Sequence, residues 1–277
     1  MTRPVCVVTG ASAGIGAAAV VEIARRGYDV ALTGRSAERL EEVAERCRAA
    51  GATARTYAVD VAELDAVRDL AKQLLTDWPR IDVLLNNAAL VTQRRHLTPD
   101  GHEQVFAVNH LAPYLLTRLL QERLVQSAPS RVVIVASDAY TFDHLDPDDY
   151  MSSTRWNPMK VYGRSKLCNL LFAAELQRRL DGTGVAVSTV HPGFVSTSLG
   201  RDNRIAAVAL KLIRPFIRTP EKGARTPVSL ATEPLGATGG ARFHVDGKVV
   251  DLDPRATDPV MAKRLWDDSA RLVGLEP

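Results

Sequence analysis

The stretch that decides the fold is VVTGASAGIG, from Val7 to Gly16. It places Gly10 and Gly14, with Gly16, directly behind the apolar residues 5–8, where a strand should pass into a helix. Glycine within an element costs about 0.5–1 kcal/mol relative to alanine, so this cluster needs a reason. A bare backbone at a strand-to-helix turn can approach a diphosphate at the helix N-terminus. The stretch therefore indicates a dinucleotide site, or else a tight turn that only needs positive φ.

The composition is that of an ordinary globular protein, with 46% apolar and 24% charged residues in a chain of 277. No apolar run approaches a membrane span, and residues 1–10 carry no signal pattern, so we expect a cytoplasmic protein. A net charge of +3 with scattered basic residues does not indicate a nucleic-acid surface. Cys6, Cys47 and Cys168 are odd in number and lack ligand spacing, so we expect neither disulfides nor a metal site.

Short apolar runs alternate with charged, helix-favouring stretches, such as the one that opens at Ser36 and stops at Gly51. Most runs are apolar on both faces, as in central parallel strands covered by helices on each side. This alternation predicts an α/β fold with a doubly wound parallel sheet in a single domain, 1–277. The expected strands are 4–9, 28–33, 53–59, 81–86, 130–136, 184–190 and 241–245.

Two segments depart from this alternation. Residues 141–157 are polar and irregular, which predicts a loop inserted between a strand and the next helix. Residues 195–227 are mixed and contain Pro215, Pro220 and Pro227, which predicts a mobile substrate flap of short helices.

Beyond the glycine turn, several motifs follow in a fixed order, and together they resemble the short-chain dehydrogenase/reductase family along essentially the whole chain. Ala89 stands where that family usually has glycine. The stretches VNHLAPYLLTRLL and YGRSKLCNLLF are most similar to the branch of retinol dehydrogenases and protochlorophyllide reductases. The resemblance implies a Rossmann-type fold that binds a nicotinamide cofactor. Its motifs are TGASAGIG, Asp60-Val61, NNAA (86–89), Asn109, Ser137, YGRSK (162–166) and HPGFVST (191–197).

Tyr162 and Lys166 form the motif with the most chemistry. Asn157 followed by Pro158 reads as a helix start, so both residues lie early in one helix and on one face. A phenol has a pKa near 10, and a nearby ammonium would lower the pKa of Tyr162 toward a useful range. By resemblance Tyr162 is the general acid, and Lys166 binds the ribose.

Ser137 and Asn109 complete the expected catalytic set. Ser137 ends a strand and should point into the crevice where open α/β sheets bind ligands, with its hydroxyl toward a substrate carbonyl oxygen. The alternative is a serine that only caps a turn. Asn109 lies in an apolar helical stretch and by resemblance holds a water that links Lys166 to solvent; the alternative is a structural amide.

The second strand ends in Gly34-Arg35 where an NAD enzyme would carry an acidic residue. Arg35 can bind a 2′-phosphate, and Ser12 can add a hydroxyl, so NADP(H) is the expected cofactor. Ala13 stands where many NADP-preferring relatives have a second basic residue, which makes the preference less steep. The expected cofactor-binding residues are Gly10, Ser12, Gly14, Ile15, Gly16, Arg35, Asp60, Val61, Asn86, Ala88, Tyr162, Lys166, Pro192, Gly193, Val195 and Thr197.

These features predict NADPH-dependent reduction of a carbonyl on a bulky lipophilic molecule. A dehydrogenase working oxidatively with NAD(P) and a non-catalytic NADP sensor remain alternatives, and monomer or homo-oligomer is open. His191 is expected to end a strand rather than bind metal. The substrate pocket should draw on 90–97, 138–157 and 195–217, whose apolar residues include Leu90, Leu145, Trp156, Phe194, Leu199, Ile205, Leu210 and Phe216.

Overall fold

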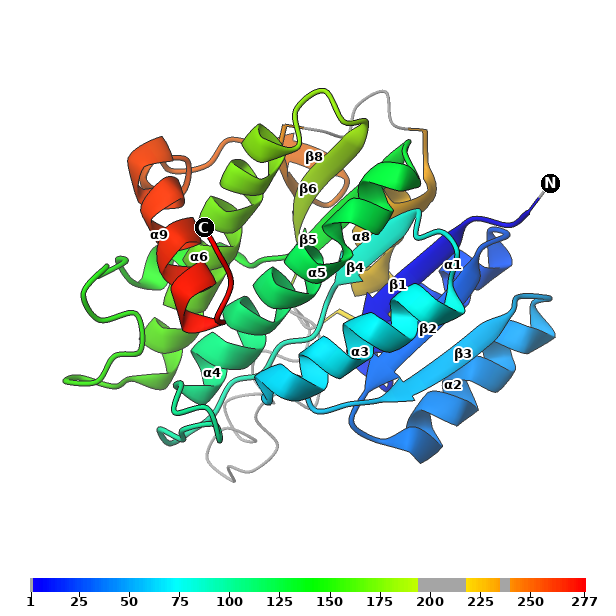
Figure 1. Cartoon of the computed structure of the whole chain (residues 1–277), viewed down its shortest axis with the longest axis horizontal. Coiled ribbons are helices and arrows are strands. Elements are labelled where there is room, and N and C mark those ends of the chain that lie inside the picture. The colour runs from blue at the N-terminus through cyan, green and yellow to red at the C-terminus, as the bar shows by residue number, and fades with distance from the viewer. Residues whose placement is uncertain (1, 194–217, 235–239) are drawn as a thin grey trace.

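The computed structural model describes residues 2–193, 218–234 and 240–277, which form a sheet between two layers of helices (Figure 1). The eight-stranded sheet has the order β3-β2-β1-β4-β5-β6-β7-β8, and all its pairs are parallel except β7–β8. The predicted Rossmann-type α/β domain is therefore confirmed. The strands are β1 (Val5–Thr9), β2 (Asp29–Gly34), β3 (Ala54–Ala58), β4 (Val83–Asn86), β5 (Ser130–Val135), β6 (Val185–His191), β7 (Phe243–Val245) and β8 (Lys248–Val250).

The helices cover the sheet on two faces, because the central strands are apolar on both sides. One face packs against α3, α5 and α6, with α9 outside them, and the other packs against α1, α2 and α8. The helices are α1 (Gly14–Arg25), α2 (Ala37–Ala49), α3 (Leu64–Asp77), α4 (Gln104–Phe106), η1 (Ala107–Leu111), α5 (Ala112–Gln126), η2 (Asp138–Phe142), α6 (Pro158–Arg179), α8 (Pro220–Thr232), η5 (Pro254–Ala256) and α9 (Pro259–Leu272).

The last strand, β8, was not predicted from the sequence. It pairs antiparallel with β7 through a tight turn at Asp246-Gly247. Both turn residues have positive φ, 52° and 75°, as a two-residue hairpin turn of type I′ requires. The dipeptide Asp-Gly between HV and KVV was the available signal for this hairpin.

The segment 141–157 is irregular after the short helix η2, as predicted, and it is anchored to the rest of the fold. Asp143 accepts a hydrogen bond from Arg164 of α6 at 2.8 Å, and the Tyr150 hydroxyl donates to Asp268 of α9 at 2.6 Å. Both contacts tie the loop to helices on the same face of the sheet.

The prediction of a mobile flap over 195–227 is wrong for its last third. Thr219 caps α8, a helix of 13 residues that opens at Pro220. Its buried side chains, such as Ala224 and Val228, pack on the α1 side of the sheet, and this burial holds the helix in place. The preceding residues, 194–217, lie outside the described part of the chain.

The C-terminal helix α9 packs against α6 (Figure 1). Trp266 is buried against Tyr114 and Phe172, at ring-centroid distances of 5.2 and 6.0 Å. Ser269 lies 2.8 Å from Nε2 of His110, a buried contact between α9 and the segment η1. Aromatic packing around this polar contact therefore fixes α9 on the α6 side of the sheet.

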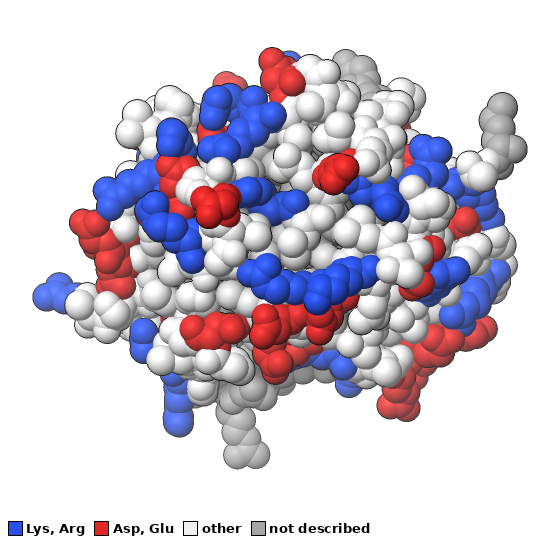
Figure 2. Space-filling model, viewed as in Figure 1, with Lys and Arg blue, Asp and Glu red and all other residues white. Residues whose placement is uncertain are grey.

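Figure 2 shows the face that carries α3, α5 and α9, where a row of Lys and Arg lies beside a row of Asp and Glu. On α3, Lys72 pairs with Asp69 at 2.8 Å and Arg68 approaches Asp65 at 3.9 Å. Opposite charges thus neighbour one another on this face. Within the described ranges, no helix has both the length and the apolar character needed to cross a membrane.

Candidate active site

The backbone geometry of the turn between β1 and α1 explains why the sequence has three glycines there. Gly10 and Gly14 have φ of 68° and 59°, in the left-handed region that side chains disfavour. Gly16 is helical, but a Cβ there would lie 2.3 Å from the carbonyl oxygen of Gly10. A Cβ on Gly10 would lie 3.0 Å from Cα of Ala88, at the end of β4. Two glycines therefore serve conformation, and the third allows a close backbone approach.

The N-terminus of α1 lacks a side-chain cap. Ala13 occupies the N-cap position, and no side-chain hydrogen bond caps this helix end. The first N–H groups of a helix have no intrahelical partner and carry the positive end of its dipole. Together with the glycines, which line the same cavity, this uncapped end fits a diphosphate.

A cavity of about 490 Å³ lies at the carboxyl ends of the parallel strands, where this fold binds ligands. It runs from the glycine turn and β2 to Tyr162 of α6, so one space joins both ends of the predicted site. The structure brings most of the predicted residues together there. Those that line the cavity are Gly10, Ser12, Gly14, Ile15, Gly16, Arg35, Asp60, Val61, Ala88, Ser137, Tyr162, Lys166, Pro192 and Gly193.

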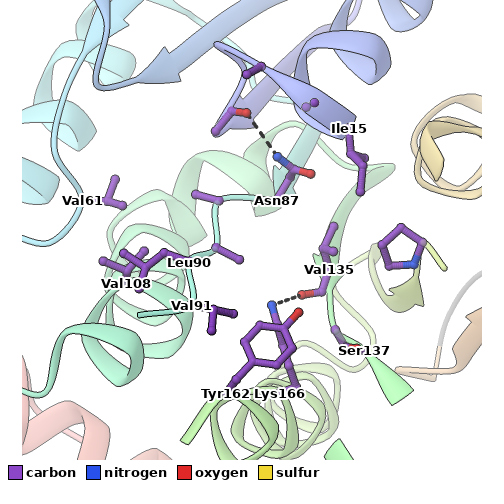
Figure 3. A pocket seen from close by; sticks show the side chains of 18 of the residues that line it. Ile15, Val61, Asn87, Leu90, Val91, Val108, Val135, Ser137, Tyr162 and Lys166 are labelled. Carbon is purple, nitrogen blue, oxygen red and sulfur yellow. Dashed lines mark hydrogen bonds between the residues drawn. The ribbon is translucent and has the colours of Figure 1, made fainter. Parts of the chain in front are cut away.

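One predicted cofactor residue, Asn86, does not line the cavity. Asn86 is buried, and its Nδ2 donates to Oγ1 of Thr117 at 3.0 Å, within the protein. Asn87 lines the cavity instead (Figure 3), and its Nδ2 donates to the carbonyl oxygen of Thr9 at 2.8 Å. Since strand residues alternate between faces, a shift by one position exchanges their roles. Val195 and Thr197 lie outside the described residues.

One lobe of the cavity is apolar. Val61, Leu90 and Val108 lie close together in Figure 3 and line this lobe. Asp60 is beside them and also lines the cavity. An apolar slot next to a carboxylate fits a purine ring with an amino group. The sequence did not single out Val108; the signal was its place directly before Asn109.

Arg35 and Ser12 lie at the mouth of the cavity next to the end of β2. Arg35 is exposed, and a Cβ on Gly34 would lie 3.1 Å from Oγ of Ser12. Glycine at position 34 thus brings the loop of Arg35 against the glycine turn. A guanidinium and a hydroxyl are presented here without an acidic residue among the cavity-lining residues of this loop.

The side chains of Tyr162 and Lys166 rise from the first turns of α6 toward Val135 (Figure 3). Nζ of Lys166 donates to the carbonyl oxygen of Val135 at 3.0 Å and lies 5.5 Å from the centre of the Tyr162 ring. Asn157 caps the helix by accepting from the N–H groups of Met159 and Lys160. The predicted cap, pair and shared face are all present.

The pKa values of this pair differ from the sequence-based expectation. Burial raises the pKa of Tyr162, and a hydrogen bond with Ser137 lowers it in part. Burial also lowers the pKa of Lys166, to about 7. The protein's own residues therefore favour a neutral phenol and make the lysine easy to deprotonate, whereas the sequence predicted a lowered phenol pKa.

Asn109 lies on η1, a short π-helical turn that is typical of functional sites. Its Oδ1 accepts from the N–H of Leu90 at 2.8 Å, and its Nδ2 donates to the Leu90 carbonyl and to Oγ of Ser165, both at 3.0 Å. Asn109 does not line the cavity. Its side chain instead fixes Leu90, which does, against the helix that carries Tyr162.

His191 ends β6, as predicted, and lines the cavity. Its Nδ1 accepts from the backbone N–H of Asp138 at 3.4 Å, and its Nε2 lies 3.3 Å from the Asp138 carboxylate. The next turn contains Gly193 with φ of 82°, where a Cβ would lie 2.6 Å from Nε of Arg218. Among the described residues no group of His, Cys, Asp and Glu has the arrangement of a metal site.

The predicted substrate side of the cavity needs correction. Leu90 lines it, but Leu145 packs on the core and Trp156 donates from Nε1 to Glu103 at 3.3 Å. Phe142 and Met159 take their place in the lining, with exposed fractions of 47% and 50%. Phe194, Leu199, Ile205, Leu210 and Phe216 lie outside the described residues.

Residues 4–207 match the family described as short chain dehydrogenase. Retinol dehydrogenase 14 from Mus musculus is 40% identical over 284 residues, covering 97% of this chain and 85% of that protein. A candidate daunorubicin C-13 ketoreductase, DnrU from Streptomyces sp. strain C5, is 40% identical over 269 residues, covering 96% and 91%.

Solved structures agree with these relatives. An uncharacterized protein from Mycobacterium paratuberculosis superposes with a TM-score of 0.81 at 32% identity, covering 99% of this chain and 95% of that one. A blue fluorescent protein from a metagenomic library, solved with NADPH, superposes with a TM-score of 0.71 at 26% identity, covering 88% and 96%. Sequence and structure therefore select the same group of proteins.

Proposed function

The chain belongs to the short-chain dehydrogenase family, and on that premise we propose that it reduces the carbonyl group of a bulky lipophilic ketone or aldehyde with NADPH. Carbonyl/alcohol redox chemistry follows from the family. The observation that supports a catalytic role most directly is the convergence of Tyr162, Lys166 and Ser137 in one cavity with the glycine turn. The remainder of the proposal concerns the direction, the cofactor and the substrate.

The proposed mechanism assigns each residue one task. A bound nicotinamide would supply the hydride, while the protein supplies orientation and the proton. The Tyr162 hydroxyl donates its proton to the substrate oxygen, and its raised pKa keeps it protonated near neutral pH, as a general acid requires. The Ser137 hydroxyl orients the same oxygen. Lys166 holds the ribose and, once protonated, stabilises the phenolate that remains.

The preference for NADPH rests on Arg35 and Ser12, which would together bind a 2′-phosphate. Arg35→Asp should raise the KM for NADPH at least tenfold and change the KM for NADH much less. Arg39→Asp is the matched control, because Arg39 is also exposed on this side of β2 but does not line the cavity. An unchanged KM for NADPH in Arg35→Asp would refute the assignment.

The substrate class is supported by the apolar surface beside Tyr162. Leu90, Val91, Phe142 and Met159 line the cavity there, and among the described residues the ionisable side chains of this part of the lining are those of Tyr162, Lys166 and His191. Two relatives carry names of enzymes for large lipophilic molecules, retinol and daunorubicin. These observations favour a bulky, lipophilic carbonyl compound.

The experiment is a panel of bulky ketones and aldehydes with NADPH or NADH, measured by loss of nicotinamide absorbance in wild type and Tyr162→Phe. We expect turnover that is faster with NADPH and at least a hundredfold slower in Tyr162→Phe, with the NADPH Kd unchanged. Turnover that survives in Tyr162→Phe would refute the role of Tyr162. Tight NADPH binding without any turnover would instead favour a nucleotide sensor.

Oxidation is the second candidate, because the similarity to a retinol dehydrogenase favours an alcohol substrate. A panel of the corresponding alcohols, measured with NADP⁺ and with NAD⁺, gives kcat/KM for the reverse reaction. If kcat/KM for alcohol oxidation with NAD⁺ exceeds every kcat/KM found for carbonyl reduction, the protein is a dehydrogenase that works oxidatively.

A further inference from the structure

The contact between His191 and Asp138 has no task in the mechanism above, although it lies at the centre of the site. His191 is the last residue of β6, and Asp138 directly follows Ser137 after β5. Both ring nitrogens approach the same residue: Nδ1 the backbone N–H at 3.4 Å, and Nε2 the carboxylate at 3.3 Å. These contacts assign the neutral imidazole with its proton on Nε2.

The contact continues the pairing of β5 with β6 beyond its backbone ladder. That ladder ends at Val135 and Val190, followed by the N–H of Ala136 donating to the Val190 carbonyl at 2.9 Å. The next residues along these strands are Ser137 and His191. A side chain therefore connects the two strands at the point where both turn into the cavity.

Ser137 depends on the backbone geometry that this contact fixes. Its φ and ψ are −166° and 151°, and its Oγ accepts from the N–H of Ala139 at 3.2 Å. With Oγ held as an acceptor, its hydrogen remains for Tyr162 or for a substrate oxygen. Movement of the Asp138 N–H would rotate the Ser137 peptide and re-aim this hydroxyl.

The charges around His191 come from every element that packs on it. Asp138 and Asp246 are acidic, while Arg218 and Lys166 are basic, and Arg218 pairs with Asp246 at 2.8 Å. Burial is the largest influence and lowers the pKa of His191. Burial thereby favours the neutral ring, the form in which Nδ1 can accept from the Asp138 N–H.

We propose that His191 and Asp138 are a positioning pair that aims the Ser137 hydroxyl and holds the Pro192-Gly193 turn in place. This inference rests on the proposed carbonyl reduction and adds that efficient reduction requires the His191–Asp138 contact. The pair touches neither hydride nor substrate, so its loss should lower kcat while leaving the cofactor site intact. A merely structural role would lower stability without separating kcat from KM.

The kinetic test uses His191→Phe, which keeps a ring and removes both nitrogens, with Asp138→Ala as the reciprocal change. We expect kcat to fall about tenfold in each, which is about 1.4 kcal/mol, and the NADPH Kd to change less than about twofold. His191→Asn should recover part of kcat, because its Oδ1 can accept from the Asp138 N–H. His244→Phe is the matched control, a buried histidine on β7 that does not line the cavity.

Wild-type kcat in His191→Phe, or equal losses of kcat in His191→Phe and His244→Phe, would overturn the proposal. Imidazole ¹⁵N NMR of the wild-type protein tests the pair without any turnover. A single Nε2–H tautomer of His191 that is lost in Asp138→Ala is the expected result, and a mixture of tautomers in the wild type would also overturn the proposal. If no carbonyl compound is reduced, the proposed function fails, while the NMR result still decides whether the pair exists.

Discussion

Replacing Lys166 by methionine should change how the stability of the protein depends on pH. Lys166 is 1% exposed, and burial lowers its pKa from the ordinary 10.5 to about 7. Between these values the unfolded chain binds a proton that the folded chain does not, so wild-type stability rises with pH across this range. Below about pH 7 the full cost of burying the ammonium is present.

The size of the effect follows from those two pKa values. From about pH 6 to about pH 9, this lysine should add about 2–3 kcal/mol to the free energy of unfolding of the wild type. Lys166→Met lacks this rise. The variant also loses the hydrogen bond to the Val135 carbonyl, and the part of that loss that does not depend on the charge of Lys166 cancels in the comparison.

Urea unfolding followed by far-UV circular dichroism, at both pH values, measures this difference. Lys160→Met is the matched control, because Lys160 lies exposed on the same helix. The reasoning fails if the wild type and Lys166→Met differ by the same amount at the two pH values, within about 0.5 kcal/mol. That outcome would mean that Lys166 keeps its charge inside the fold.

Three further changes test other parts of the structure. Gly16→Ala should weaken NADPH binding at least tenfold in a fluorescence titration, since its Cβ would meet the Gly10 carbonyl oxygen at 2.3 Å; unchanged affinity would contradict the close approach. Asn109→Ala should cost about 2–3 kcal/mol in urea unfolding, because the buried Asn109 side chain loses its hydrogen bonds to the Leu90 backbone and to Ser165, and a loss under about 0.5 kcal/mol would refute this. Trp266→Ala should cost about 3–5 kcal/mol, while Val260→Ala on the same helix, 76% exposed, should change stability by less than about 0.5 kcal/mol; equal effects would show that α9 does not stabilise the fold.

The core of the fold could be predicted because its signals are local. Most of the seven expected strands are apolar on both faces, and the Asn157-Pro158 start of α6 lies in adjacent residues. The hairpin β7–β8 was missed because β8 is only three residues long and exposed, so burial leaves no pattern in it. Its stability comes from the turn at Asp246-Gly247 and from the neighbouring strand.

The site was predicted less completely, because contacts between distant segments decide it. Whether Asn86 or Asn87 faces the cavity depends on the pleat of β4 against β1, and adjacent asparagines hide that choice. The same applies to the pKa of Tyr162: the sequence showed the lysine four residues away, but the extent of burial arises only in the packed structure. The sequence suggested Trp156 as a pocket residue because it is large and apolar, yet its indole N–H donates a hydrogen bond to Glu103.

Gly193 and Arg218 touch, although residues 194–217 separate them in the sequence. Asp246 accepts a hydrogen bond from Arg218 at 2.8 Å and fixes its side chain. Gly193 and Arg218, which flank the intervening segment, therefore lie next to each other at a fixed position. Exchanging that segment for one of another length therefore leaves the distance to be closed unchanged, and each doubling of its length costs only about 0.6 kcal/mol in closure entropy. Such a junction suits the grafting of segments from related enzymes, with α6 and the glycine turn left as they are.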